Sequence, residues 1–314
     1  MLFRSAVYEG LQVPIDTGLL IEARLFTNVL QSKVVEAMIG TLFMAKNELD
    51  KGARRPAEFP PTNIKKVGII GAGLMGAGIA YVSALNGLDV VLIDTTEEKV
   101  NAGKETINKL ASKLVSRKKI TEQAKDELLA RVNGTMYFES LRDVDLVIEA
   151  VFEDRELKDR VLQTVQEVVG LDTIIASNTS TLPITSLADN LKDPGKFIGI
   201  HFFSPVDKMM LVEVIMGKET NDLSLATALD FVRIIKKTPI VVNDSRGFYA
   251  NRCVLNYVRE GHLMLAEGIP AAMIENCAKM AGMPVGPLAL NDEVGLDLGW
   301  RILQATKNDL GDSA

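Results

Sequence analysis

Histidine and cysteine are scarce in this sequence. Its 314 residues include only two histidines, His201 and His262, and two cysteines, Cys253 and Cys277. Two histidines so far apart argue against a histidine-rich metal site, and neither cysteine has neighbours at metal-ligand spacing. So few cysteines provide no disulfide framework and suit a reducing compartment. We therefore expect neither a metal site nor a disulfide-stabilised fold.

The sequence also lacks an excess of positive charge and any long apolar run. The net charge is −6 and the pI is about 5.2, which gives no electrostatic attraction for nucleic acid or an anionic membrane. No uncharged apolar run approaches the roughly 18 residues of a transmembrane segment. Residues 1–10 show no signal-peptide core, and no transit-like segment is visible. We expect a protein of the bacterial cytoplasm, with the mitochondrial matrix as the alternative.

The sequence does contain a glycine-rich turn between two apolar segments. A short strand-like run stops at Gly71, Gly73 and Gly76, spaced G-x-G-x-x-G, and a helical pattern follows. In this fingerprint the first glycine makes the tight turn, the second admits a pyrophosphate, and the third lets helix and strand pack closely. The helix N-terminus then attracts the phosphates with its unpaired N–H groups. The pattern predicts a dinucleotide site.

An acidic residue follows at the expected distance. The next apolar run, 89–93, ends at Asp94. A carboxylate about 20 residues after the glycines, at a strand end, accepts hydrogen bonds from the adenosine ribose hydroxyls. The same charge repels a 2′-phosphate, which favours NAD over NADP. The alternative is a glycine turn in a similar fold that binds nothing, and the complete fingerprint disfavours it.

The length of the chain favours about two domains. We expect a linker over residues 1–61 with one long helix from Asp16 to Asp50, and an NAD-binding domain over residues 62–243. In that domain strand-like runs alternate with helical patterns, which predicts a Rossmann-type α/β fold with a mostly parallel sheet. Residues 244–314 form a partial all-α domain, with helices expected at 247–267, 271–281 and 292–307.

Polar residues stand at the ends of several predicted strands. Glu153, Ser180 and His201 each lie at or just after such a run. Ligands of parallel sheets gather at the carboxyl ends of the strands. We therefore expect these three side chains near the same edge of the sheet as Gly73.

His201 has a predicted partner in the next strand. Glu213 lies inside an apolar run, and a buried carboxylate needs a partner. If the two strands pair antiparallel about the connecting loop 204–210, His201 faces Glu213, with Cβ atoms about 5 Å apart. A glutamate that accepts from one ring nitrogen fixes the tautomer and raises the basicity of the other. Such a pair suits a general base that removes a proton from an alcohol while hydride leaves the same carbon.

Six motifs in order carry a family resemblance: Gly71–Gly78, Glu149–Glu153, Ser177–Ser180, His201–Pro205, Leu211–Glu213 and Gly247–Arg252. Together they resemble the L-3-hydroxyacyl-CoA dehydrogenases of fatty-acid β-oxidation. The segment Glu9–Pro56 resembles the part that joins hydratase to dehydrogenase in the multifunctional β-oxidation α subunit. The hydratase domain and the second half of the helical region have no counterpart in this sequence, so the chain resembles an excerpt of a larger enzyme.

The resemblance implies a role for each matching residue. His201 would be the catalytic base and Glu213 its partner. Ser180 would contact the substrate hydroxyl and the nicotinamide, and Asn251 would bind the substrate oxygen. Many relatives carry asparagine where this chain has Ser204, whose hydroxyl has a shorter reach. The residues expected to line the cofactor site are Gly71, Gly73, Leu74, Met75, Gly76, Asp94, Val151, Phe152, Glu153, Lys158, Ser180 and Ser204.

The expected activity is therefore the NAD-dependent oxidation of an L-3-hydroxyacyl-CoA to the 3-ketoacyl-CoA. The resemblance implies an acyl-CoA substrate and, for the full-length protein, a homodimer or a complex with a thiolase subunit. One alternative is a non-catalytic NAD-binding fragment. Another is a different NAD-linked β-hydroxyacid dehydrogenase, which would use a lysine instead of the histidine–glutamate pair.

Overall fold

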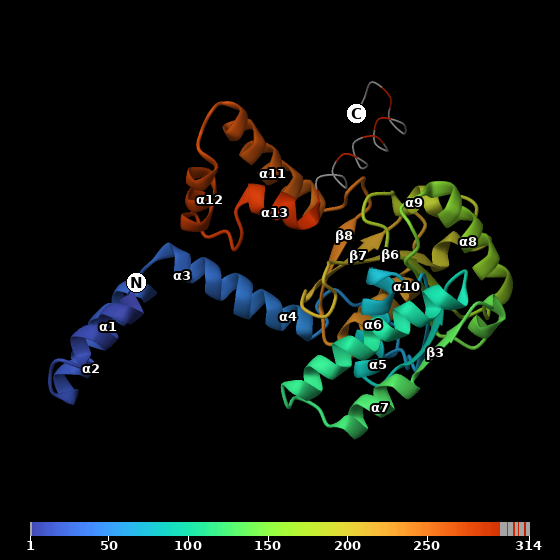
Figure 1. Ribbon diagram of the computed structural model, residues 1–314, viewed down its shortest axis with the longest axis horizontal. Coiled ribbons are helices and arrows are strands. Elements are labelled where there is room, and N and C mark those ends of the chain that lie inside the picture. The colour runs from blue at the N-terminus through green and yellow to red at the C-terminus, as the bar shows by residue number, and fades with distance from the viewer. Residues whose placement is uncertain (1, 296–299, 301–303, 305–306, 308–310, 312–314) are drawn as a thin grey trace. The chain divides into compact units, whose positions relative to one another are not determined.

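The computed structural model describes residues 2–295, 300, 304, 307 and 311. Contacts within the chain divide it into two units, residues 1–55 and 56–314 (Figure 1). Each unit is described by itself. Among the described residues, no helix combines the length and the apolar character needed to cross a membrane.

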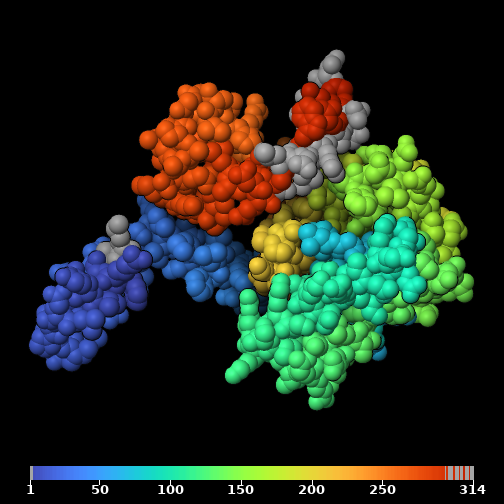
Figure 2. All heavy atoms as spheres, in the orientation of Figure 1, coloured from blue at the N-terminus to red at the C-terminus, as the bar shows by residue number. Residues whose placement is uncertain are grey.

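The amino-terminal unit consists of helices, and none of its described side chains is buried (blue in Figure 2). The single helix expected from Asp16 to Asp50 is wrong. The chain breaks after Leu30, because the Ser32 hydroxyl accepts a hydrogen bond from Val35 N and starts a new helix. Asp16 lies in the first turn of the preceding helix, whose N-cap is Pro14. The elements are α1 (Leu2–Gly10), α2 (Ile15–Leu30), α3 (Lys33–Met38), the π-helix η1 (Ile39–Ala45) and α4 (Lys46–Asp50).

An eight-stranded sheet forms the centre of the second unit, with strand order β3-β2-β1-β4-β5-β6-β7-β8. All neighbouring strands run parallel except β6 and β7, which are antiparallel. This is the expected Rossmann-type arrangement. The strands are β1 (Lys66–Ile70), β2 (Asp89–Ile93), β3 (Val132–Thr135), β4 (Leu146–Glu149), β5 (Ile174–Ser177), β6 (Phe197–Phe202), β7 (Leu211–Met216) and β8 (Thr238–Asn243).

Helices cover both faces of this sheet, because its strands are apolar on both sides. Side chains of α5, α6, α7 and α10 pack on one face, around Ile79 and Phe231. Side chains of α8 and α9 pack on the other face, around Leu162 and Leu187. The elements are α5 (Leu74–Leu85), α6 (Glu97–Ser116), α7 (Glu122–Ala130), η2 (Phe138–Leu141), α8 (Arg155–Val168), α9 (Ile184–Ala188), η3 (Pro194–Lys196) and α10 (Asp222–Ile234).

Three further helices follow the sheet: α11 (Ala250–Ala266), α12 (Ala271–Met280) and α13 (Pro287–Val294). The first two match the expected segments closely. The third, α13, was not predicted: it overlaps the helix expected over residues 292–307 by three residues only and ends at Val294, where Gly295 follows with φ +95°. Pro287 occupies its first turn, where a missing N–H costs nothing. Most of the helix expected over residues 292–307 lies outside the described residues.

Candidate active site

Each of the three fingerprint glycines is required for a different structural reason. Gly71 has φ +102°, and a Cβ there would lie 2.5 Å from the Ala150 carbonyl oxygen. A Cβ on Gly76 would collide with the carbonyl oxygen of Gly71. A Cβ on Gly73 would meet no atom of the protein within 4 Å. The fold therefore explains two of the glycines, whereas the third keeps a space clear outside the protein, which fits a cofactor approaching the backbone.

The helix that follows this turn, α5, starts without a side-chain cap. Four neighbouring helices, α6, α7, α8 and α10, begin with a side chain that accepts a hydrogen bond from a backbone N–H. The N-cap of α5 is Gly73, which has no side chain to do so. Unpaired N–H groups and the positive end of the helix dipole are left for an anion. Leu74, in the first turn, is 71% exposed beside them.

Asp94 follows β2 directly beside the glycine turn. One of its carboxylate oxygens accepts a hydrogen bond of 2.8 Å from Ala72 N, and the other accepts one of 2.7 Å from Thr95 N. The carboxylate thus holds the turn in place. The first oxygen, Oδ2, has that one donor and retains acceptor capacity for a ribose hydroxyl, whereas Oδ1 also accepts from Thr95 Oγ1 at 3.2 Å.

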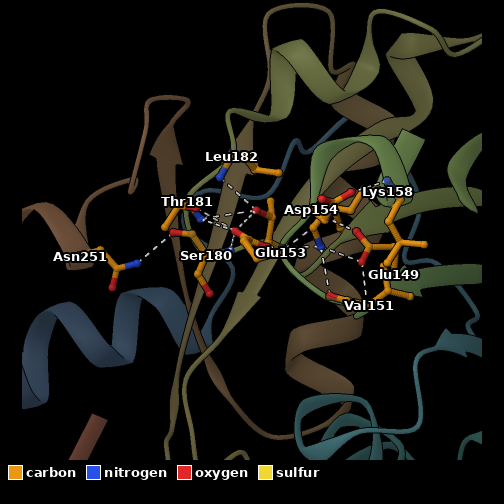
Figure 3. A network of polar contacts seen from close by, with 12 residues as sticks. Glu149, Val151, Glu153, Asp154, Lys158, Ser180, Thr181, Leu182 and Asn251 are labelled. Atoms are coloured by element: carbon orange, nitrogen blue, oxygen red, sulfur yellow. Dashed lines mark hydrogen bonds and ion pairs between the residues drawn. The ribbon is translucent and has the colours of Figure 1, made fainter. Parts of the chain in front are cut away.

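Glu153 organises the loop after β5 (Figure 3). Its Oε1 accepts hydrogen bonds from the backbone N–H groups of Ser180 (3.0 Å) and Thr181 (2.9 Å). The hydroxyls of Thr179 (2.6 Å) and Thr181 (2.9 Å) donate to the same oxygen. Burial alone would raise the pKa of Glu153, but the Lys158 ammonium and these donors outweigh it and lower the pKa. An ionised Glu153 therefore fixes the backbone that carries Ser180.

Lys158 is buried next to Glu153 and is not exposed to solvent. Its side chain is 1% exposed, and its Nζ lies 2.8 Å from Glu149 Oε1 and 3.4 Å from Glu153 Oε2. Glu149 also accepts from Ser177 Oγ (2.6 Å) and Val151 N (2.7 Å). Sequence reasoning placed Lys158 at the cofactor site but missed Glu149 as its partner. The signal was present, because a glutamate at the end of a buried strand needs a cation.

His201 and Glu213 face each other across β6 and β7, as the predicted register required. His201 Nδ1 lies 2.8 Å from Glu213 Oε2, and the side chains are only 4% and 0% exposed. Phe203 and Phe248 contact the imidazole ring, with ring centroids 4.6 and 5.8 Å away. Because Nδ1 is engaged with the carboxylate, Nε2 is the nitrogen available for a substrate proton.

The second oxygen of Glu213 binds the start of α11. Oε1 accepts from Ala250 N (2.8 Å) and Tyr249 N (3.1 Å). Burial would raise the pKa of Glu213, but the hydrogen bond with His201, the two backbone donors and the charge of His201 leave it lowered. An ionised Glu213 can therefore stabilise an imidazolium. It also ties the pair to the helical region, a contact that spacing in the sequence did not indicate.

The remaining expected residues lie at the same edge of the sheet. The Asn251 side chain donates to the Ser180 carbonyl at 2.9 Å, so the two residues lie together, as Figure 3 shows. Phe152 is 81% exposed and Met75 is half-buried. Ser204 directly follows the half-buried Phe203 and precedes the cis-proline Pro205. Their roles toward a cofactor stay predictions.

Two buried polar residues near the site were missed. Asn178 Oδ1 accepts from Phe202 N at 2.9 Å and so joins the ends of β5 and β6. Lys237 Nζ donates to the Val206 and Met209 carbonyls, both at 2.6 Å. Burial lowers the pKa of Lys237, although Asp207 opposes the shift. Nothing in its sequence context, between a second lysine and a threonine, distinguishes Lys237 from a surface lysine.

The fold and these contacts define a dinucleotide-binding oxidoreductase, with a glycine turn, a carboxylate after β2 and a histidine–glutamate pair at one edge of a mostly parallel sheet. Comparison with family models identifies the particular family. Residues 66–245 match "3-hydroxyacyl-CoA dehydrogenase, NAD binding domain", and residues 247–314 match "3-hydroxyacyl-CoA dehydrogenase, C-terminal domain". The chain belongs to the 3-hydroxyacyl-CoA dehydrogenase family, and its cofactor is NAD.

Individual relatives agree with this result. The chain is 39% identical over 309 residues to the fatty acid oxidation complex subunit alpha of Shewanella frigidimarina, an alignment that covers 98% of the chain and 43% of that protein. The chain thus spans less than half the length of such relatives. The (S)-3-hydroxybutyryl-CoA dehydrogenase PaaH1 of Ralstonia eutropha superimposes with a TM-score of 0.76 at 38% identity, covering 80% of this chain and 89% of that one. FadB2 of Mycobacterium tuberculosis gives 0.75 at 34% identity, covering 80% and 90%.

Proposed function

We propose that the chain oxidises an L-3-hydroxyacyl-CoA to the 3-ketoacyl-CoA in fatty-acid β-oxidation, with NAD as the oxidant. The observation that carries the proposal is the buried His201–Glu213 pair, 2.8 Å apart, at the strand edge that also bears the glycine turn. A base beside a dinucleotide site is what alcohol oxidation requires. The Ralstonia eutropha enzyme compared above is named as a dehydrogenase of (S)-3-hydroxybutyryl-CoA, a substrate of the same class.

NAD, held by the glycine turn and Asp94, would supply the hydride acceptor for C3 of the substrate. His201 Nε2 takes the proton of the C3 hydroxyl, so the imidazole becomes an imidazolium. Glu213 holds Nδ1–H and offsets the new positive charge. The Ser180 hydroxyl and the Asn251 amide hold the substrate oxygen, which fixes the reacting geometry.

A substrate and partners follow from the same proposal. The chain would bind an acyl-CoA, and in a longer protein it would form a homodimer or a complex with a thiolase subunit. The Shewanella relative is named as a subunit of a fatty acid oxidation complex, which supports the second arrangement. We place the protein in the bacterial cytoplasm.

The proposal is tested by following NADH oxidation with acetoacetyl-CoA, alongside calorimetry of NAD binding. We expect turnover and binding together. Binding without turnover would contradict catalysis by this chain and favour the non-catalytic NAD-binding fragment. Turnover that survives loss of His201 would favour the other NAD-linked dehydrogenases, in which a lysine is the base.

A further inference from the structure

Lys237 is a buried cation in the second unit that plays no part in the proposed proton transfer. It lies between α10 and β8 and is 6% exposed. The end of α10 sets its direction, because Lys236 adopts the left-handed φ of +57° and Lys237 N donates to Val232 O at 3.0 Å. Burying an ammonium is unfavourable unless its N–H groups find acceptors. The acceptors of Lys237 therefore reveal what the residue does.

Both acceptors lie in the β6–β7 loop, residues 203–210. The Lys237 ammonium donates to Val206 O and Met209 O, each at 2.6 Å, so one cation holds two points of the same loop. The loop has a turn of its own, in which Lys208 N and Met209 N both donate to Pro205 O. Hydrogen bonds to a charged donor are stronger than neutral ones, so the ammonium tethers this loop more firmly than the backbone bond from Thr238 N to Met210 O at 2.9 Å does.

The β6–β7 loop joins the two halves of the candidate active site. It follows β6 directly and leads directly into β7. The strand β6 carries His201, and β7 carries Glu213. It contains Ser204, which is expected to line the cofactor site. On its other side the buried Val206 packs against α5, where a Cβ on Gly78 would lie 2.9 Å from Val206 Cβ. The position of the loop is therefore set jointly by Lys237 and by the cofactor-binding helix.

We propose that Lys237 is a positioning residue whose ammonium clamps the β6–β7 loop against α5 and so places Ser204 for the cofactor. A methionine of similar length would fill the same volume without the cost of burying a charge, but it would leave Val206 O and Met209 O without their donor. The inference rests on the proposed function only in assigning Ser204 to the cofactor site.

The test compares Lys237→Met, which removes the donors, with Lys237→Arg, which keeps them. The matched control is Lys236→Met, the same chemical change at the adjacent exposed lysine. We expect Lys237→Met to raise the Kd for NADH about tenfold, which corresponds to about 1.4 kcal/mol. We expect Lys237→Arg to recover most of this loss and Lys236→Met to bind NADH like the wild type.

Hydrogen exchange provides a readout that needs no cofactor. In the free protein, the amides of Lys208 and Met209 should exchange faster in Lys237→Met than in the wild type, because the turn is no longer tethered. A variant that melts at a lower temperature but keeps the wild-type Kd, KM, kcat and amide exchange would overturn the proposal, because Lys237 would then serve stability alone.

Two further outcomes remain decisive. If Lys237→Met does not fold, Val206→Ala loosens the same loop from its α5 side and should reproduce the higher Kd for NADH; an unchanged Kd would overturn the proposal. If the wild type binds NADH but does not reduce acetoacetyl-CoA, the proposed function fails. The ratio of NADH affinities and the amide exchange still decide the role of Lys237.

Discussion

The two units use apolar residues in opposite ways. In the second unit, the apolar side chains of β1 are buried on both faces of the sheet, and Val67 and Ile69 are fully inaccessible. In the amino-terminal unit, regularly spaced apolar residues such as Phe26 and Leu42 remain more than half exposed. Apolar patterns thus predict a strand or a helix in either unit, but only burial against the sheet fixes the position of a side chain, and a site needs side chains in fixed positions.

The strongest contrast is between a buried and an exposed ion pair. Replacing Lys158 with methionine leaves Glu149 charged and buried, so we expect the free energy of unfolding to fall by about 3–5 kcal/mol. The matched change in the amino-terminal unit is Lys46→Met, which breaks an exposed pair with Asp50 at 2.8 Å. It should cost no more than about 0.5 kcal/mol. Urea unfolding measures both, and equal losses would refute the contrast.

Substitutions at two fingerprint glycines of the second unit should affect different properties: one the stability of the fold, the other the binding of NADH. Gly76→Ala places a Cβ against the Gly71 carbonyl, so we expect a loss of about 3 kcal/mol in unfolding free energy. Gly73→Ala places its Cβ in open space and should leave the melting temperature unchanged. It should nevertheless weaken NADH binding about tenfold or more, because the pyrophosphate needs that space. Thermal melting with NADH titration checks both, and unimpaired binding in Gly73→Ala would count against the cofactor pose.

Acid should destabilise the sheet unit through Glu213. Its pKa is lowered in the native state from an ordinary value of 4.5. Its contribution to stability is therefore complete above that value and is lost as the pH falls through the lowered native pKa. Glu213→Gln should make the unfolding free energy depend less on pH in this acid range. Urea unfolding at a series of acid pH values measures this, and a wild-type slope in Glu213→Gln would contradict the account.

The smallest effect is expected from removing residues 1–55. These residues form a separate unit, and the contacts described for the site come from the second one. We expect the shortened chain to bind NADH within about twofold of the intact chain, which is less than 0.5 kcal/mol. Fluorescence titration of both chains measures this. Loss of binding would mean that the division into two units does not hold for the site.

The sequence predicted the pairing of His201 with Glu213 better than it predicted the ends of the elements. The register of His201 and Glu213 followed from the loop length and strand alternation, because a shift by one residue would turn Glu213 to the opposite face. The strand Val132–Thr135 was missed, since only one of its four residues is apolar. The break after Leu30 was missed because apolar spacing continues across it, and only the Ser32 cap marks the new helix.

The sequence also did not reveal which groups are the partners of the buried charges. Lys237 and Glu149 are paired with groups far away in the chain or in another element, and no local pattern identifies such partners. The Asn251 contact with the Ser180 carbonyl joins the helical region to the loop after β5, again across a long separation. Long-range polar contacts of this kind follow from the folded arrangement of the strands rather than from spacing.

The most direct test of the central claim, that His201 is the base of an NAD-dependent dehydrogenase, is to measure turnover and NADH binding in His201→Ala. The account predicts that the rate of acetoacetyl-CoA reduction falls by about a thousandfold, as expected for loss of a general acid–base group. NADH should bind with the wild-type affinity, because the glycine turn and Asp94 are untouched. Turnover within about tenfold of the wild type would contradict the assignment.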